Sequence, residues 1–379
     1  MQTSQHRILT SHVGSLPRSK AVTDVVFAQE RGEQPAGADE VIAAAVSDVV
    51  ARQVATGVDI VSDGEMSKIS YATYIKDRIT GFDGDSERNP PSDLQEFPGF
   101  LERQSSSGGT PTYRRPCCVG AIAVKDMQPL TNDIDNMKAA MESNPPTEGF
   151  MNAASPGVIA LFQPDKHYGS HEKYLAALAD AMAAEYRAIV DAGLVLQLDS
   201  PDLGLGRHMM FKGKSDEEYT RLASLHVEAL NHSLSGIPKD RVRLHVCWGN
   251  YEGPHHHDAP MELVLPVALK ADVGALLFES ANPRHAHEWR VFAETKLPDD
   301  LVLMPGVIDS TTNFVEHPKL VAERIERFAN IVGRERVVAG SDCGFSTFAG
   351  FGAVDEDIVY AKLGSLAEGA ALASDALWG

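Results

Sequence analysis

The sequence predicts an α/β fold and, within that class, a (β/α)8 TIM barrel. Two observations predict it. From residue 172 onward, short apolar segments alternate with longer segments of helical periodicity, which is typical of a parallel sheet covered by helices. Along the whole chain of 379 residues, eight apolar segments qualify as strands, and eight strands close such a barrel.

Each predicted strand is a short apolar run that ends at polar or turn-forming residues. The runs are 7–14, 58–65, 149–160, 194–199, 241–247, 274–279, 301–307 and 336–341. Helical periodicity covers 39–56, 172–193, 216–235, 261–271, 286–296, 318–333 and 355–374. A doubly wound sheet is the alternative, but no G-x-G-x-x-G motif opens any of these helices, so the sequence does not support a dinucleotide site.

Residues 83–115 interrupt the alternation, because they are rich in Pro, Gly, Ser and charged residues. We predict a single domain over 1–379, with 83–115 as a flap inserted after the second strand. This flap is either a mobile cover, an oligomer contact or a solvated loop. The following segment, 115–126, is predicted to add a hairpin strand outside the barrel, with Cys117 and Cys118 as packing residues.

Composition narrows the class of protein. A net charge of −19 and a pI near 5.1 argue against nucleic acid or an anionic membrane as partner, because no basic field attracts phosphates. The N-terminal residues lack the apolar stretch of a signal peptide, and no run of about 18 apolar residues predicts a membrane span. Four cysteines in so long a chain favour a reducing, cytoplasmic setting over a disulfide framework.

Polar side chains follow the predicted strands at the points where they end, which is where barrel enzymes carry their functional residues. The set comprises His12, Ser15, Asp63, Glu65, Asp199, His245, Cys247, Glu279, Asp309, Asp342 and Cys343. One or two such positions would mean little, but so many are difficult to assign to packing alone. We therefore expect a site at this end of the barrel.

Four of these residues have the chemistry of a zinc site. His245 and Cys247 are two apart on a strand and point to one face, Cys343 follows the last strand, and Glu279 ends an apolar run where an unpaired carboxylate is costly. Two sulfurs, one imidazole and one carboxylate suit tetrahedral Zn²⁺. The alternative is a core histidine with two inert cysteines.

A thiolate-rich zinc site suits thiol activation, because metal coordination deprotonates a thiol. An incoming substrate sulfur could then displace Glu279. A zinc hydrolase is an alternative of another class. The loop 255–257 holds three consecutive histidines and is interpreted as a solvated loop that binds stray metal, with a second metal site or a substrate contact as alternatives. Trp248 either walls the site or belongs to the core or rim.

These motifs resemble the catalytic C-terminal barrel of cobalamin-independent methionine synthase over nearly the whole chain. The matching segments are "HVC" 245–247, "FES" 278–280 and "SDCG" 341–344, and the resemblance implies that His245, Cys247, Glu279 and Cys343 ligate zinc. It further implies that the amino-acid substrate meets Gly14 and Ser15 of "HVGSLPR", Glu65 of "SDGE" and Asp199 of "QLDSPDL".

The sequence departs from that family in the half of the site that serves the methyl donor. Ser200 replaces a glutamate, Thr311 stands where the family has a histidine proposed as an acid, and "ALFQPDK" keeps only the aromatic Phe162 of a folate-contacting stretch. The resemblance covers the catalytic barrel alone, and we expect no counterpart of the family's large N-terminal barrel. Single-barrel relatives include epoxyalkane:coenzyme M transferase, in which a zinc-bound thiolate opens an epoxide.

We therefore predict a zinc-dependent thiol alkyl- or methyltransferase. His245, Cys247, Glu279 and Cys343 hold Zn²⁺, and the predicted substrate contacts are Gly14, Ser15, Glu65, Asp199, Phe162 and Thr311. The partners are a small thiol, such as homocysteine, and an alkyl or methyl donor, with a homo-oligomer left open. Epoxide opening by a thiol is the first alternative, and a non-catalytic zinc- or thiol-binding relative is the second.

Overall fold

The computed structural model describes residues 1–87, 90–106 and 114–379. Eight parallel strands form one sheet in the order β1-β10-β9-β8-β7-β6-β5-β2. Their bounds are β1 (Leu9–Thr10), β2 (Ile60–Val61), β5 (Glu148–Ala154), β6 (Val195–Asp199), β7 (Val242–His245), β8 (Ala275–Phe278), β9 (Val302–Ile308) and β10 (Val338–Ser341). Except at the two ends of the sheet, where β10 joins β1 and β5 joins β2, neighbours in the sheet are consecutive strands of the chain.

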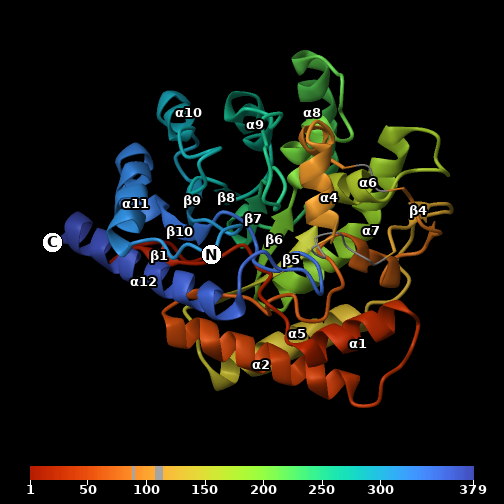
Figure 1. Cartoon of the computed structure of the whole chain (residues 1–379), viewed down its shortest axis with the longest axis horizontal. Coiled ribbons are helices and arrows are strands. Elements are labelled where there is room, and N and C mark those ends of the chain that lie inside the picture. The colour runs from red at the N-terminus through yellow and green to blue at the C-terminus, as the bar shows by residue number, and fades with distance from the viewer. Residues whose placement is uncertain (88–89, 107–113) are drawn as a thin grey trace.

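The two end strands meet, so the sheet nearly closes on itself. The Asp59 amide donates to the Thr10 carbonyl at 3.2 Å, and the Ser11 hydroxyl donates to the Ile60 carbonyl at 3.2 Å. Figure 1 shows the strands at the centre of the molecule with helices around them. The predicted (β/α)8 barrel is confirmed.

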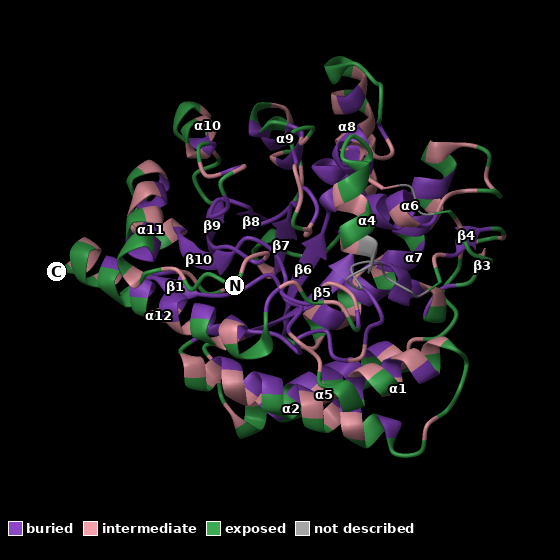
Figure 2. Ribbon diagram, in the orientation of Figure 1, coloured by how far each residue is buried: buried purple, intermediate pink, exposed green. Residues whose placement is uncertain are grey.

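Helices surround the strands and bury their apolar faces against them (Figure 2). They are α1 (Lys20–Glu30), α2 (Ala38–Thr56), α5 (Gln128–Ser143), α6 (Pro156–Phe162), α7 (His171–Asp191), α8 (Asp216–Ser233), α9 (Met261–Ala268), α10 (Trp289–Glu294), α11 (Pro318–Val332) and α12 (Glu356–Trp378). Short 3₁₀ turns are η1 (Thr73–Asp77), η2 (Pro201–Leu203), η3 (Leu205–His208), η4 (Lys239–Arg241) and η5 (Arg334–Arg336).

Three predicted strands are too long: 7–14 shortens to β1 and 58–65 to β2, and 149–160 changes most. The segment 149–160 was expected to be extended throughout, but β5 ends at Ala154 and α6 follows at once. Ser155 caps this helix by accepting from the Val158 amide at 3.1 Å, and Pro156 occupies the first turn, where its missing N–H costs nothing. The apolar residues after Ala154 are therefore a buried helix, which apolar composition alone does not distinguish from a buried strand.

Beneath the mouth of the barrel, the interior is closed by a buried arginine. Arg243 of β7 is fully buried, and its guanidinium donates to the Gln197 side chain at 2.8 Å, the Ser11 hydroxyl at 3.0 Å and the His12 carbonyl at 3.1 Å. The same guanidinium lies 3.5 Å from the ring centroid of Phe150. These contacts satisfy a charge that would otherwise be costly to bury, and they give the site above a fixed floor.

The insertion after β2 contains its own secondary structure. β3 (Phe82–Asp83) pairs antiparallel with β4 (Cys117–Cys118), which confirms the predicted extra hairpin. Between them lie α3 (Ser92–Gln95) and α4 (Pro98–Ser106). Asp93 and Leu94 are buried, so the reading of 83–115 as a solvated loop is wrong for this part of it. Residues 88–89 and 107–113 of the predicted flap lie outside the described residues.

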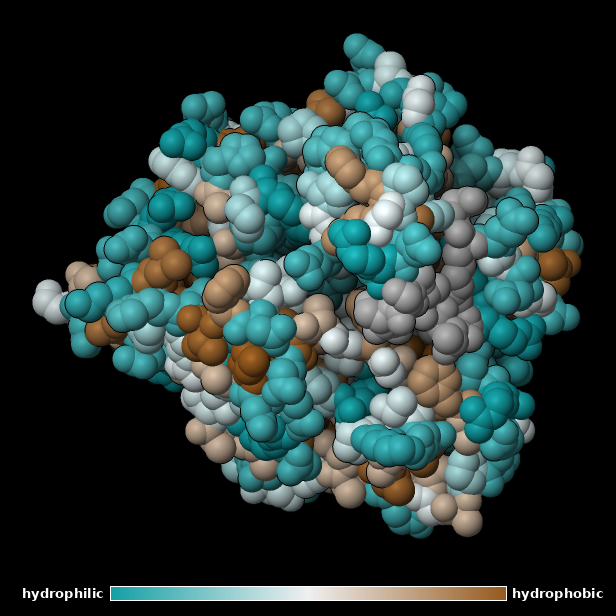
Figure 3. Space-filling view, viewed as in Figure 1, coloured by the Kyte–Doolittle hydropathy of each residue, from teal (hydrophilic) through white to brown (hydrophobic). Residues whose placement is uncertain are grey.

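The face of the molecule seen in Figure 3 is mainly hydrophilic, with hydrophobic residues in small groups. None of the helices that the structure describes combines the length and hydrophobicity that a bilayer crossing would need.

Candidate metal and thiol site

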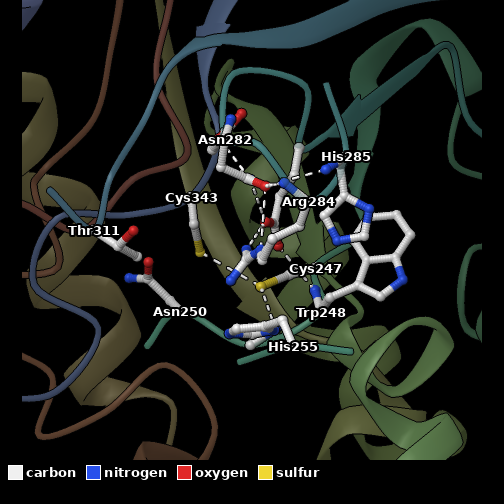
Figure 4. A network of polar contacts seen from close by, with 12 residues as sticks. Cys247, Trp248, Asn250, His255, Asn282, Arg284, His285, Thr311 and Cys343 are labelled. Carbon is white, nitrogen blue, oxygen red and sulfur yellow. Dashed lines mark hydrogen bonds and ion pairs between the residues drawn. The ribbon is translucent and has the colours of Figure 1, made fainter. Parts of the chain in front are cut away.

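Three of the predicted zinc ligands converge at the mouth of the barrel. His245 ends β7, Cys247 lies two residues further on, and Cys343 lies two residues past the end of β10. All three side chains are buried, and their ligand atoms lie within 4.8 Å of one another. The two sulfurs are 3.6 Å apart, too far for a disulfide bond of about 2.05 Å, and Figure 4 shows them directed toward each other.

A carboxylate fixes the orientation of the imidazole. Asp199, at the end of β6, lies with Oδ1 3.0 Å from Nδ1 of His245. The carboxylate is itself held by the side-chain amides of Gln197 and Asn152, each at 2.9 Å. Among the described residues, Nε2 of His245 has no hydrogen-bond partner although it is buried. This arrangement, with one ring nitrogen on a carboxylate and the other available, is typical of metal-ligating histidines.

The electrostatics of the cluster favour a thiolate. The hydrogen bond from Cys247 and the charge on His245 lower the pKa of Cys343 to about 6. Burial alone would lower the pKa of His245, but the hydrogen bond with Asp199 raises it to about 10. The same hydrogen bond with Cys343 and burial raise the pKa of Cys247 well above its usual value. Of the two sulfurs, Cys343 is therefore the one that these contacts favour as a thiolate.

Glu279, the fourth predicted ligand, lies beside this group but not in it. Its carboxylate forms an ion pair with Arg284, accepts from the Trp248 amide at 3.0 Å and accepts from the Asn282 side chain at 2.8 Å. Arg284 keeps the pKa of Glu279 below its ordinary value despite burial. Figure 4 draws Arg284 and Asn282 in the same network of polar contacts as the two cysteines.

The loop that carries Glu279 is tied to the segment that carries Cys343. Asp342 accepts from the backbone amides of Ser280, Ala281 and Asn282 at 2.7, 2.8 and 2.8 Å. Two segments about 60 residues apart in the sequence are therefore held together, one carrying Glu279 and the other Cys343.

These residues fit a zinc ion. The donor set is two cysteine sulfurs and an imidazole nitrogen that no described residue hydrogen-bonds, and such a borderline-soft set prefers zinc to magnesium or calcium. With Zn–S bonds of about 2.3 Å in a tetrahedral arrangement, two sulfur ligands lie about 3.8 Å apart, close to the 3.6 Å found here.

A cavity of about 390 Å³ opens onto the cluster, and its walls are largely apolar. Of the predicted site residues, Ser15, Glu65, Phe162, Asp199, His245, Cys247 and Cys343 line it. Aromatic side chains form much of the wall: Tyr71, Phe162, Tyr251, Phe348 and Phe351. Pro90, Pro91, Leu94, Leu101 and Gln104 come from the insertion between β3 and β4, so this insertion roofs the cavity.

Gly14 and Thr311 do not line this cavity. The Gly14 amide donates to Nδ1 of His12 at 3.1 Å, and a Cβ at this position, where φ is 140°, would meet the Asn152 side chain at 2.3 Å. Gly14 is thus required for close packing. The Thr311 hydroxyl donates to Asp309 of its own loop at 2.9 Å.

Glu65 is a strained and partly unpaired acid at the cavity. Its φ of 57° is unusual for a residue other than glycine, and Oε2 is buried without a hydrogen-bond partner among the described residues. Burial, and to a lesser extent the charge on Asp199, raise the pKa of Glu65 to about 7. An unsatisfied carboxyl at a cavity wall is suited to receive a polar group of a substrate.

Sequence reasoning missed several residues of the site. Asn282 and Arg284 belong to the segment "ANPR" 281–284, which follows "FES" directly. An arginine five residues after a glutamate that was expected to be buried could have indicated the ion pair. Asn250 also lines the cavity and donates to the Gly344 carbonyl at 2.6 Å. The apolar residues of the roof had no signal, because the insertion has the composition of a loop.

For Cys117, Cys118, Trp248 and the histidines 255–257, the exposure of the side chain decides between the alternative interpretations. Cys117 and Cys118 are buried, as the packing interpretation predicts. Trp248 is fully buried with its indole 4.3 Å from the His285 ring, and it does not line the cavity. His255 is also buried, so the interpretation of 255–257 as a solvated loop is wrong for this residue. His256 and His257 are exposed.

The protein is a (β/α)8 barrel in which two cysteines and a histidine lie together at the carboxyl ends of the strands. The insertion between β3 and β4 covers them. Residues 8–356 match the family described as "Cobalamin-independent synthase, Catalytic domain", and the chain belongs to this family.

Two relatives and one solved structure illustrate the similarity. The chain is 24% identical to a methionine synthase of Saccharolobus solfataricus, over 95% of this chain and 93% of that protein. It is 27% identical to a 2-hydroxypropyl-CoM lyase of Xanthobacter autotrophicus, over 96% and 94%. The structure of a B12-independent methionine synthase from Shewanella sp. W3-18-1, in complex with selenomethionine, superposes with a TM-score of 0.71 at 17% identity and covers 98% of this chain and 99% of that one.

Proposed function

We propose that this protein transfers a methyl or larger alkyl group to the sulfur of a small thiol, with a zinc ion held by His245, Cys247 and Cys343. Glu279, which lies beside them and pairs with Arg284, would be the fourth ligand. The observation that carries the proposal is the buried Nε2 of His245, which has no hydrogen-bond partner among the described residues and lies beside the sulfurs of Cys247 and Cys343 at the end of a cavity. Membership of the family supports this proposal. Relatives named methionine synthase and 2-hydroxypropyl-CoM lyase support it as well.

When bound, zinc would hold the substrate thiol as a thiolate at neutral pH. The protein's own residues would prepare the site. Asp199 orients His245, Arg284 balances the charge of Glu279, and Glu65 with Ser15 would receive the polar tail of the thiol. Because the substrates would be held together in a cavity roofed by α3 and α4, orientation supplies a large part of the rate.

The second candidate is the opening of a small apolar epoxide by a thiol. The specific observation in its favour is the cavity wall, where aromatic and aliphatic side chains outnumber polar ones. Such a wall suits an alkyl electrophile, whereas a pterin ring needs several hydrogen-bond partners. The relative from Xanthobacter, a 2-hydroxypropyl-CoM lyase by name, is consistent with this alternative.

The test is a matrix of thiols and carbon electrophiles. Homocysteine, cysteine and 2-mercaptoethanesulfonate are each incubated with methyl donors and with epoxides of two to six carbons, and loss of free thiol is measured. We expect one thiol to be consumed by the zinc-loaded protein and not by the Cys343→Ser variant. If thiols bind and no electrophile reacts, the protein is a binding relative, and if esters or amides are cleaved without any thiol, it is a zinc hydrolase. Either result overturns the proposal.

We further propose that 1–379 form a single domain, with 83–115 as a flap within it.

A further inference from the structure

A second cluster of metal-ligand side chains lies on the surface, away from the buried site. Glu96 follows α3 in the insertion, and His256 and His257 belong to the loop after β7. Nε2 of His256 lies 3.0 Å from Oε2 of Glu96, and Nε2 of His257 lies 2.5 Å from Oε1. The three ligand atoms lie within 4.8 Å of one another, and their side chains are 39% to 53% exposed.

The two segments that carry this trio are locked together directly beneath it. Asp93 of α3 is fully buried and accepts from the Tyr251 hydroxyl at 2.8 Å and from the His255 amide at 2.9 Å. His255 has a φ of 53°, and its ring bonds Asp258 at 3.0 Å and the Tyr251 carbonyl at 3.0 Å. The backbone positions of His256 and His257 are therefore fixed relative to α3.

A further contact restrains one of the ligands. The ring of Phe97, next to Glu96 in the chain, meets the His256 ring edge to face at 5.7 Å between centroids. The His256 and His257 rings are 4.2 Å apart. The trio is thus largely preorganised, and a metal ion that replaces the shared hydrogen bonds would need little rearrangement of the backbone.

We propose that Glu96, His256 and His257 form a second divalent metal site, of the zinc class, that clamps the insertion onto the loop after β7. Two imidazoles and one carboxylate suit Zn²⁺ or Co²⁺, and they are not the all-oxygen set that Mg²⁺ and Ca²⁺ prefer. The exposed position leaves room for water to complete the coordination.

This clamp connects to the cavity through the same insertion. Leu94 lies two residues before Glu96, and Leu101 lies five residues after it, and both line the cavity roof. Glu96 and the two histidines can bind one metal ion together only while the insertion is packed against the loop that carries His256 and His257. Metal binding therefore stabilises this packed state relative to states in which the two segments separate. Metal occupancy at the surface would therefore hold the roof of the cavity in place.

The experiment is a calorimetric Zn²⁺ titration of the full chain whose buried site has been loaded beforehand. We expect the wild type to bind one additional equivalent, and the H256Q/H257Q double variant to bind it at least tenfold more weakly. The E96Q variant, which keeps the shape of the side chain, should fall between the two. The matched control is H232Q, because His232 is an exposed histidine that contacts one carboxylate, Asp180, at 2.7 Å.

The wild type and the variants all contain the same buried site of His245, Cys247 and Cys343. The difference in Zn²⁺ binding between them therefore does not depend on how many ions that site binds. If wild type and H256Q/H257Q bind Zn²⁺ with the same stoichiometry and affinity, the site is refuted. Hydrogen exchange of residues 92–104 tests the clamp separately. Zn²⁺ should slow it at least threefold in the wild type and H232Q but not in H256Q/H257Q, and equal exchange with and without Zn²⁺ in the wild type refutes the clamp.

Discussion

Asp199 and His245 form the relationship on which the site depends: Oδ1 of the carboxylate lies 3.0 Å from Nδ1 of the imidazole. The side-chain amides of Gln197 and Asn152 hold the same carboxylate in place. Because Nδ1 is occupied, Nε2 is the nitrogen left available beside the sulfurs of Cys247 and Cys343. Asp199 at the end of β6 thus determines how His245, the predicted ligand at the end of β7, is oriented.

Asp199→Asn should weaken metal binding about 10- to 100-fold, because outer carboxylates orient metal-ligating histidines and raise their basicity. Competition with a chelator of known affinity measures the change. The matched control is Asp202→Asn, since Asp202 contacts Nδ1 of another buried histidine, His226, at 2.8 Å. Equal metal affinity in the two variants would show that the Asp199 contact has no part in the site.

The Arg284–Glu279 ion pair should be strongly coupled. In the metal-free protein, Arg284→Met should lower the free energy of unfolding by about 3 kcal/mol, because it leaves a buried carboxylate without its cation. Glu279→Gln should recover at least a third of that loss in the double variant. Urea unfolding of the four proteins of the cycle measures the coupling, and additive effects of the two substitutions would contradict a direct pair.

Glu65 should make stability depend on pH. Its pKa rises from an ordinary value of 4.5 to about 7 in the folded protein, so the folded state keeps a proton that the unfolded state loses. The contribution of Glu65 to the free energy of unfolding is fully present below about pH 4.5. It decreases by roughly 3 kcal/mol as the pH rises toward 7, and it does not change further above that pH.

Glu65→Gln should remove that part of the slope and stabilise the protein at pH 8. Urea unfolding at half-unit steps of pH between 4.5 and 8 tests this, with the wild type as reference. An unchanged slope in the variant would mean that another group carries the pH dependence.

Phe162 should contribute to selection of the electrophile, because its ring forms part of the cavity wall and contacts Tyr71 edge to face at 5.8 Å. Phe162→Ala should lower kcat/KM about tenfold for a six-carbon epoxide and less than threefold for a two-carbon one, which follows from about 1.4 kcal/mol of lost apolar contact. Phe314→Ala is the control, since Phe314 is 79% exposed. Equal losses for both epoxides would place Phe162 outside the electrophile's path.

Periodicity predicted the barrel because each strand and helix has its own local signal. His245, Cys247 and Cys343 were also predictable, since parallel strands bring their carboxyl ends to one edge of the sheet. The position of Glu279 was not, because its partner Arg284 lies on an irregular loop whose path depends on Asp342, about 60 residues further along the chain.

The structure of the insertion could not be predicted from the sequence either. Its Pro, Gly, Ser and charged residues indicate a loop, yet Asp93 is buried against Tyr251 and His255. A single buried acid with distant partners leaves no periodic trace in the sequence. The roof of the cavity could therefore not be predicted from composition.

The most direct test of the central claim is the metal content of the purified, fully reduced protein, measured in the H256Q/H257Q background so that the surface cluster does not contribute. After exposure to Zn²⁺ and dialysis against a weak chelator, it should retain one zinc per chain, and the Cys343→Ser variant should retain less than a tenth of that. Cobalt substitution should give intense sulfur-to-metal absorption that changes when the substrate thiol is added. Retention of no zinc, or equal retention with and without Cys343, would contradict the account.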